Sequence, residues 1–449
     1  MERNVIMAKV IPFRGLRYNT EKFQDLNAVT APPYDVISPA EQQALYSKDE
    51  YNVIRLDYGM DFVSDDETNN RYTRSGAYLE KWIAENQLLP EDEPAFYIYE
   101  QIFSLGQEDP SHSLKGIVGL VRLEDFSEKI VIPHEETVAK AKEDRLKLMQ
   151  ATRANTSQIY SLFMDEDKAV ARLLEEQSDR EPDLSFITEE NVTQNVWVVT
   201  DKELHTKIST FFEDKQIFIA DGHHRYETAL SYRDLKREED GTEKGTMPYD
   251  YVMMTLVSMS DGGLFVFPTH RMVRGTEGFD EILLVGFLTE QFTVSKIYFT
   301  EGDYAEIITE RLANTVDEIL FGLYTGQNYY YLLKLKDTEE LDATVSGKSE
   351  TYKHLDVTVL HKLILEKHLG IDAESMHDQK NLVYTRNAHE AIKAVQNGDF
   401  ECVFLMNPTK VSEIKEIAQA NEKMPQKSTF FWPKLVTGIV INRFDDISF

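Results

Sequence analysis

The segment Ile217–Leu230 (IFIADGHHRYETAL) gathers phosphate-binding residue types where a strand is followed by a helix. Its apolar start favours a buried strand, and helix-type sequence begins near Arg225. Free backbone N–H groups and the positive end of the helix dipole then lie where His223 and His224 project. Gly222 lets a ligand approach the backbone, arginine suits phosphate oxygens, and histidine donates a hydrogen bond or carries a proton. The segment therefore predicts a phosphate site.

Two other interpretations of this segment stay open. The first is a structural turn with a satisfied histidine pair and with Arg225 in a surface ion pair. The second is a metal site, because Asp221, His223 and His224 are of ligand type. Adjacent histidines point in different directions, however, and no H-E-x-x-H pattern accompanies them.

The segment Ile132–Arg145 (IPHEETVAKAKEDR) forms a second junction between a strand and a helix. Glu135 follows the apolar run, and Lys142 and Arg145 share one face of the predicted helix because they are three residues apart. Carboxylates beside cations suit proton abstraction from a substrate bound next to a phosphate. Helix-start chemistry explains the segment equally well, since Thr137 can cap the helix and an acidic residue favours its N-terminus.

Three shorter motifs carry weaker signals: Ala31–Ser38 (APPYDVIS), Pro268–Arg271 (PTHR) and Lys427–Thr429 (KST). The two prolines of the first motif predict a rigid turn, which loop architecture alone also explains. The KST motif is not a P-loop, because no G-x-x-x-x-G precedes it. A G-x-G-x-x-G fingerprint is missing as well, so a dinucleotide fold has no support.

These local cations belong to a strongly acidic chain. The 449 residues include 48 Lys and Arg against 78 Asp and Glu, a formal net charge of −30. This balance argues against a general nucleic-acid binder and against binding to an anionic membrane. With 42% hydrophobic and 11% aromatic residues, the chain is too apolar to be disordered. Islands of cations in such a chain favour a small multivalent anion as ligand, with chance clustering on solvated helix faces as the alternative.

The sequence also predicts the cellular compartment. Cys402 is the single cysteine, which excludes an intrachain disulfide and a Cys-based zinc site. The first residues lack the apolar stretch of a signal peptide, and no run reaches the roughly 18 apolar residues of a membrane helix. We therefore expect a cytoplasmic protein with no membrane partner.

The elements that must position these residues alternate between strands and helices. The composition of short runs predicts strands at 96–102, 115–121, 129–133, 196–199, 217–220, 402–406 and 435–441. Helices are predicted at 78–86, 139–153 and 411–420, with another starting near 387. This order indicates a mixed α/β (α+β) fold. We expect an N-terminal mixed α/β domain over 1–170 with the HEET and KEDR motifs, a segment over 171–275 with DGHHR, and a C-terminal α/β domain over 276–449.

The motifs APPYDVIS, PHEETVAKAKEDRLKLMQATRANTS, ADGHHRYETAL, PTHRMV and MPQKSTFFWPKLVTGIVI follow in this order. With them the chain resembles the bacterial family known as domain of unknown function 1015, from about Val10 to Ile441. The DGHHR segment is also similar to the phosphate-binding G-x-x-R loop of the ParB/sulfiredoxin superfamily, which includes partition-protein nucleotide hydrolases, sulfiredoxin and kinases acting on free serine. The resemblance implies a ParB/sulfiredoxin-like nucleotide-binding core and ATP-dependent phosphorylation of free L-serine.

The resemblance also implies roles for single residues. Gly222, His223, His224 and Arg225 would hold nucleotide phosphates, with Asp221 at the metal or the turn. In the superfamily's serine kinases a glutamate takes the hydroxyl proton. Glu135 is the candidate because its HE-x-T pattern matches the family, and Glu227 is the reserve. His223 stands where sulfiredoxin has its cysteine, which removes sulfinic-acid repair, and the DNA-reading helix-turn-helix of the partition proteins is not evident.

We therefore expect a phosphotransferase that uses ATP and Mg²⁺ to phosphorylate free serine or a similar small amino acid. The expected catalytic residues are Glu135, His223, His224 and Asp221, with Asp221 also at the metal; the expected phosphate-binding residues are Gly222, Arg225, Lys142, Arg145, His270, Arg271 and Lys427. A ParB-like regulatory protein that binds or hydrolyses nucleotide, and a metal-dependent phosphatase acting on phosphoserine, are the alternatives. Nucleic acid is not an expected partner, and the oligomeric state stays open, with a homo-oligomer as one option.

Overall fold

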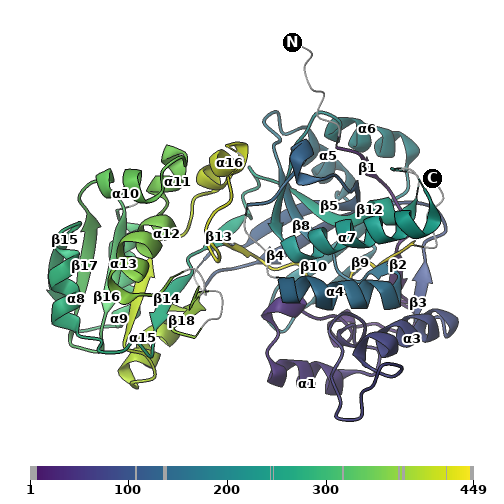
Figure 1. Ribbon diagram of the computed structural model, residues 1–449. Helices are drawn as coiled ribbons and strands as arrows, with labels where there is room; N and C mark the ends of the chain where they lie inside the picture. Colours follow the sequence, from purple (N-terminus) through teal and green to yellow (C-terminus); the bar gives the residue numbers. More distant parts are fainter. Residues whose placement is uncertain are drawn as a thin grey trace. The chain divides into compact units, whose positions relative to one another are not determined.

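The chain divides into two compact units, which are described separately (Figure 1). The computed structural model describes residues 8–106, 109–134, 139–242, 244–245, 247–315, 318–372, 375–376, 380–420 and 422–444. Unit 1 comprises Met1–Pro133, Thr137–Leu264 and Pro433–Phe449, and unit 2 comprises His134–Glu136 and Phe265–Trp432. The domain boundary expected at 170–171 falls inside unit 1, where strands from both sides of it pair in one sheet, and the boundary expected at 275–276 falls inside unit 2.

Unit 1 is built on a mixed sheet, which in the described part of the chain has the order β6-β11-β8-β12-β5-β4-β10-β9, with β1 paired to β5. The strands are β1 (Val10–Ile11), β4 (Phe96–Phe103), β5 (His112–Arg122), β6 (Val131–Ile132), β8 (Ile159–Phe163), β9 (Leu184–Ile187), β10 (Thr193–Val199), β11 (Ile217–Asp221) and β12 (Tyr251–Ser258). The pairs β6–β11 and β8–β12 are parallel and the others antiparallel. The strands predicted at 96–102 and 115–121 are confirmed, whereas only Val131–Ile132 of the run at 129–133 forms a strand.

One face of this sheet carries the apolar core of unit 1. Ile98, Ile117 and Trp197 belong to a cluster of buried side chains that also includes residues of α5 (Ala169–Gln177), α6 (Lys202–Phe212) and α7 (His223–Asp240). The helix α4 (Ala139–Thr152), predicted at 139–153, packs on α7 and on α3 (Arg71–Ala84). The predicted helix at 78–86 belongs to α3, which begins earlier because the side chain of Asn70 caps it.

The remaining short elements of unit 1 lie around this core. They are β2 (Leu16–Tyr18) paired with β3 (Leu88–Pro90), β7 (Ala154–Asn155) paired with β21 (Asn442–Arg443), α1 (Pro39–Lys48), α2 (Ile54–Asp57), and the 3₁₀ turns η1 (Leu26–Ala28), η2 (Tyr34–Val36), η3 (Phe126–Glu128) and η4 (Pro248–Asp250). The η2 turn lies within the APPYDVIS motif, whose rigid turn was expected from its prolines.

The other face of the sheet is polar along β4, because successive side chains of a strand point to opposite faces. There the Tyr99 hydroxyl accepts a hydrogen bond from the Val436 N–H (3.3 Å), and the Gln101 amide donates to the Lys434 carbonyl (3.0 Å). The C-terminal segment Pro433–Ile441 therefore contacts this polar face.

The strand predicted at 435–441 is wrong. The segment makes isolated pairings, Ala31 with Thr437 and Leu16 with Ile441, rather than a continuous ladder. Gly438 has a φ of +100°, a left-handed conformation that turns the backbone out of an extended run. The apolar side chains are nevertheless buried, so burial alone gave the run the composition of a strand.

Unit 2 is an antiparallel sheet covered on both faces by helices. Its order in the described part is β15-β17-β16-β19-β14-β18. The strands are β14 (His270–Val273), β15 (Phe292–Tyr298), β16 (Leu320–Tyr324), β17 (Tyr329–Leu335), β18 (Leu382–Thr385) and β19 (Cys402–Met406), and β13 (Phe265–Phe267) pairs separately with β20 (Phe430–Trp432). Phe404 belongs to one core cluster and its neighbours Val403 and Leu405 to another, so both faces of the sheet are buried.

The helices of unit 2 complete this layered arrangement. They are α8 (Glu281–Leu288), α9 (Tyr304–Ala313), α10 (Glu339–Thr344), α11 (Glu350–His354), α12 (Asp356–Val359), the π-helix η5 (Leu360–Glu366), α13 (Lys367–Leu369), α15 (Ala388–Gln396) and α16 (Val411–Gln419). Asn387 caps α15 as its sequence predicts, and α16 matches the helix predicted at 411–420. The mixed α/β fold class is thereby confirmed. Among the described residues, none of the helices has the length and apolarity needed to cross a bilayer.

Candidate functional site

The junction of β11 and α7 has the geometry of an anion-binding helix start. Gly222 lies between them with a φ of +96° and, as a glycine, provides no side chain to cap the helix. The helix begins at His223, two residues before the start that the sequence indicates. The Tyr226 N–H donates a hydrogen bond to the Gly222 carbonyl (3.0 Å). Because the first N–H groups of a helix have no partner within it, they and the helix dipole favour an anion at this end.

Arg225 folds back onto this turn. A Cβ atom at Gly222 would lie 2.8 Å from Nε of Arg225, so glycine is required both by the positive φ and by the packed guanidinium. Nη1 of Arg225 donates to the Gln158 carbonyl, and Nη2 lies 3.5 Å from Oδ2 of Asp221. Nε is buried and has no hydrogen-bond partner within the described part of the chain. Arg225 is thus held in place with donor capacity left over.

Arg145 is fixed by a second, more deeply buried set of contacts. Its guanidinium donates to the Asp57 carbonyl (2.7 Å), lies 3.7 Å from Oδ1 of Asp57, and pairs with Asp144 (2.7 Å). Thr156 (2.6 Å) and Ser157 (3.3 Å) donate hydroxyl hydrogen bonds to the same Asp57 oxygen. Although burial opposes its charge, the two carboxylates hold the pKa of Arg145 above its ordinary value. The guanidinium is therefore committed to carboxylates of this chain.

The APPYDVIS motif reaches the same place. The ring of Tyr34 lies under the Arg145 guanidinium at 4.0 Å, a cation–π contact. Burial raises the pKa of the Tyr34 hydroxyl, and the Arg145 cation opposes that rise. This contact gives the motif a structural role beside the site, which its composition alone did not indicate.

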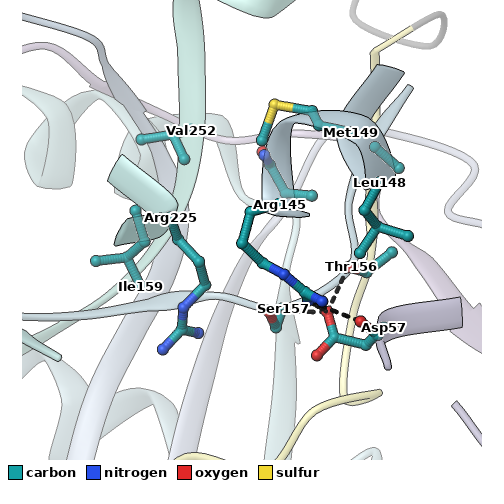
Figure 2. A pocket seen from close by; sticks show the side chains of 11 residues that line it. Asp57, Arg145, Leu148, Met149, Thr156, Ser157, Ile159, Arg225 and Val252 are labelled. Carbon is teal, nitrogen blue, oxygen red and sulfur yellow. Dashed lines mark hydrogen bonds and ion pairs between the residues drawn. The ribbon is translucent and has the colours of Figure 1, made fainter. Parts of the chain in front are cut away.

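Arg145 and Arg225 both line a small cavity (Figure 2). Its volume is about 30 Å³, which is the share of one water molecule in the liquid. Asp57, Arg145, Met149 and Arg225 contribute to its walls, and in Figure 2 the Arg145 guanidinium reaches toward Asp57. This cavity is too small for a nucleotide.

Lys434 is a cation of this site that the sequence-based list does not contain. Its Nζ lies 3.5 Å from Oδ2 of Asp221, the same oxygen that Arg225 approaches, and 13% of its side chain is exposed. Asp57 and Gln158 were missed as well. Lys434 belongs to the MPQKSTFFWPKLVTGIVI motif, and this was the one sequence feature that could have identified it. No sequence feature singled out Asp57 or Gln158.

Of the other residues predicted for the site in unit 1, His223 and His224 lie at the junction itself, and Lys142 lies on α4. Lys142 pairs with Glu227, the reserve base, at 2.7 Å between α4 and α7. His223 is buried and His224 half-buried at the helix start. Glu135, the candidate base, lies outside the described residues.

His270, Arg271 and Lys427 belong to unit 2. Arg271 is fully buried on β14, where its guanidinium donates to the carbonyls of Thr269 and Lys427 (2.9 Å for Lys427). His270 accepts a hydrogen bond from the Met406 N–H (3.3 Å), and burial together with the Arg271 cation lowers its pKa to about 3. Lys427 itself is exposed, so its backbone, not its amino group, meets Arg271.

Asp221, His223 and His224 are of metal-ligand type. Among the described residues, no three His, Cys, Asp or Glu side chains come together in a way that would hold a metal ion. The described part of the chain therefore gives no protein-built metal centre at Asp221, His223 and His224.

Several solved structures are similar to this chain at low levels. A free serine kinase in complex with AMP has a TM-score of 0.32 and 16% identity, over 70% of this chain and 86% of that one. A conserved hypothetical protein from Pyrococcus furiosus has a TM-score of 0.34 and 14% identity, over 74% and 97%. SbnI with a C-terminal truncation, from Staphylococcus aureus, has a TM-score of 0.34 and 12% identity, over 72% and 86%.

No curated protein matches the chain. One family model does, described as "Protein of unknown function (DUF1015)", and it matches residues 10–358, which is well over half of the chain. The match includes the Ala31–Ser38 motif, the α4 segment and the β11–α7 junction, as the order of these motifs in the sequence implied. The chain belongs to the DUF1015 family.

Proposed function

We propose that this protein is an ATP-dependent phosphotransferase that phosphorylates the hydroxyl of free L-serine or a similar small amino acid. The observation that supports it most is the placement of Arg225. Its guanidinium is held by the Gln158 carbonyl and by Asp221 at the start of α7. An arginine fork and a helix N-terminus meeting at one point suit a phosphate group.

Phosphoryl transfer depends on positioning and on neutralising charge more than on covalent chemistry. In this proposal the first N–H groups of α7 and Arg225 bind phosphate oxygens, and His224 adds a donor at the same turn. Arg145 anchors the loop that carries Thr156 and Ser157 through Asp57, which keeps the Gln158 carbonyl in place for Arg225. His223 is buried at the same turn.

A carboxylate must orient the acceptor hydroxyl, and Glu135 stays our candidate for this role. Glu227 is a weaker candidate, because its carboxylate pairs with Lys142 at 2.7 Å and is therefore already engaged. Nucleotide phosphates bring Mg²⁺ with few protein ligands, since this ion keeps several waters and binds one or two carboxylates. A Mg²⁺ supplied in this way would neutralise the charge of the phosphates.

The decisive assay is amino-acid-dependent formation of ADP. Purified protein is incubated with ATP, Mg²⁺ and a panel of amino acids, and ADP and O-phosphoserine are measured. ADP that appears only with serine or a close analogue supports the proposal, and its absence for every amino acid contradicts it. Release of phosphate from phosphoserine without nucleotide would point to a phosphatase, and nucleotide binding with neither reaction would point to a regulatory protein.

Substitutions localise the activity. His224→Ala and Arg225→Ala are expected to abolish phosphate binding while the protein stays folded by circular dichroism. Lys207→Ala is the matched control, because Lys207 lies on α6 and is exposed. Normal ATP affinity in both site variants would refute the placement of the site at this junction.

A further inference from the structure

The C-terminal segment Pro433–Ile441 is hydrogen-bonded to two side chains of β4 and to Gln158 of the candidate site. The Lys434 carbonyl accepts from Gln101 (3.0 Å), the Val436 N–H donates to Tyr99 (3.3 Å), and the Val436 carbonyl accepts from the Gln158 amide (3.0 Å). These bonds fix the backbone from the Lys434 carbonyl to the Val436 carbonyl, immediately after the Lys434 side chain.

The Lys434 ammonium meets Arg225 at a single carboxylate oxygen. Nζ of Lys434 and Nη2 of Arg225 both lie 3.5 Å from Oδ2 of Asp221, and both side chains are almost nine-tenths buried. Charge-assisted hydrogen bonds are normally about 2.7–2.9 Å long. Both contacts to Asp221 are longer than this, and they bring two cations to one carboxylate oxygen.

Gln158 links these two cations a second time. Its carbonyl accepts from Arg225, and its side-chain amide donates to the segment that carries Lys434. One residue therefore sets the positions of both. Two cations that face one point, and that are positioned by a shared residue, match a doubly charged oxyanion better than a single carboxylate of an amino acid.

We propose that Lys434 and Arg225 together bind one phosphate group of a nucleoside di- or triphosphate, and that Asp221 is the positioning residue that holds the two cations together. This inference rests on the proposed function, because it concerns the same site. It assigns Asp221 a role other than metal binding: a divalent cation at Oδ2 would be repelled by two neighbouring positive charges.

The test measures binding rather than turnover. Affinities for ADP, ATP and inorganic phosphate are determined by calorimetry for the wild type, Lys434→Met, Lys434→Arg and the control Lys207→Met. Lys434→Met is expected to weaken ADP and ATP binding by about 10- to 100-fold, Lys434→Arg to restore most of it, and Lys207→Met to change nothing. Melting temperatures establish that each variant is folded.

Wild-type ADP affinity in folded Lys434→Met would overturn the inference, and so would a wild type that binds neither nucleotide nor phosphate. If binding depends on Lys434 but no amino acid stimulates ADP formation, the inference stands and the proposed kinase activity fails.

Asp221→Asn separates positioning from metal binding. ADP affinity is measured in Mg²⁺ and in EDTA. A positioning role predicts the same fold-change in both conditions, because the cations lose their shared partner whether or not metal is present. A loss that occurs only with Mg²⁺ would show that Asp221 is a metal ligand and would overturn its assignment.

Discussion

Two regions of the molecule contain arginines that the sequence marks in the same way, yet the fold uses them differently. Arg225 lies just after the end of β11, at the start of α7, and 11% of its side chain is exposed there. Arg271 lies in β14, which pairs with β18 on one side and β19 on the other, and its side chain is completely buried under neighbouring elements. A side chain in a central strand faces the layer that covers the sheet, whereas a side chain just past a strand end faces the junction. This contrast predicts that Arg225 binds a ligand and that Arg271 stabilises the fold.

The largest effect is expected inside unit 1, where Arg145 resembles Arg271 in burial but pairs with carboxylates. Arg145→Met leaves Asp57, which is 3% exposed, without its cation, and breaking a buried pair costs about 3–5 kcal/mol. We expect the lower end, because Thr156 and Ser157 still donate to Asp57. Denaturant unfolding measures the loss. The double variant with Asp57→Asn should be less destabilised than the sum of the two single variants; simple additivity would contradict the coupling.

Arg225→Met tests the binding side of the comparison. We expect an approximately 100-fold loss of ADP affinity, or about 2.7 kcal/mol, since a charge-assisted contact to phosphate disappears. The melting temperature should change little, because Arg225 spans one carbonyl and a long contact to Asp221. Calorimetric titration with ADP gives the affinity. A variant that binds ADP normally but melts much earlier would make Arg225 a structural residue like Arg271.

Much of the fold, and part of this contrast, could be read from local sequence. The β-branched and aromatic residues at 96–102 and the apolar run Ile217–Ala220 predicted strands that exist, and Asn387 marked the start of a helix. The phosphate-binding residue types at Gly222–Arg225 likewise converge at a helix start, as their local order predicted.

The residues that sequence reasoning missed are linked by contacts between distant parts of the chain. Gln158 bonds to Val436, 278 positions away, and Arg145 bonds to Asp57, 88 positions away. The local sequence does not identify such partners, because the residues around one buried polar residue look like those around any other. The run at 435–441 shows the same limit: burial produced its apolar composition, while its backbone pairs at isolated residues instead of forming a strand.

Arg271→Met tests the structural side of the comparison. Its removal leaves the buried carbonyl of Thr269 and the partly buried carbonyl of Lys427 without these donors, and such losses cost about 1–3 kcal/mol. We expect a loss of about 2 kcal/mol in the unfolding free energy of unit 2, with ADP affinity unchanged. Lys427→Gln is the control, because only its backbone meets Arg271. A folded Arg271→Met protein that loses ADP binding would erase the difference between the two regions.

The smallest effect sharpens the same contrast through pH. His270 has a folded-state pKa of about 3, lowered by burial and by Arg271, against about 6.5 when unfolded. Between these values the unfolded chain binds the extra proton, so the stability due to neutral His270 is complete above pH 6.5 and falls as the pH is lowered toward 3. The slope approaches about 1.4 kcal/mol per pH unit near pH 5. His270→Gln keeps an acceptor for the Met406 N–H and should lose this slope. Parallel stability curves for the two proteins between pH 7 and 5 would mean that His270 takes up its proton at the same pH in the folded and unfolded states. In that case burial in β14 would no longer distinguish Arg271 from Arg225.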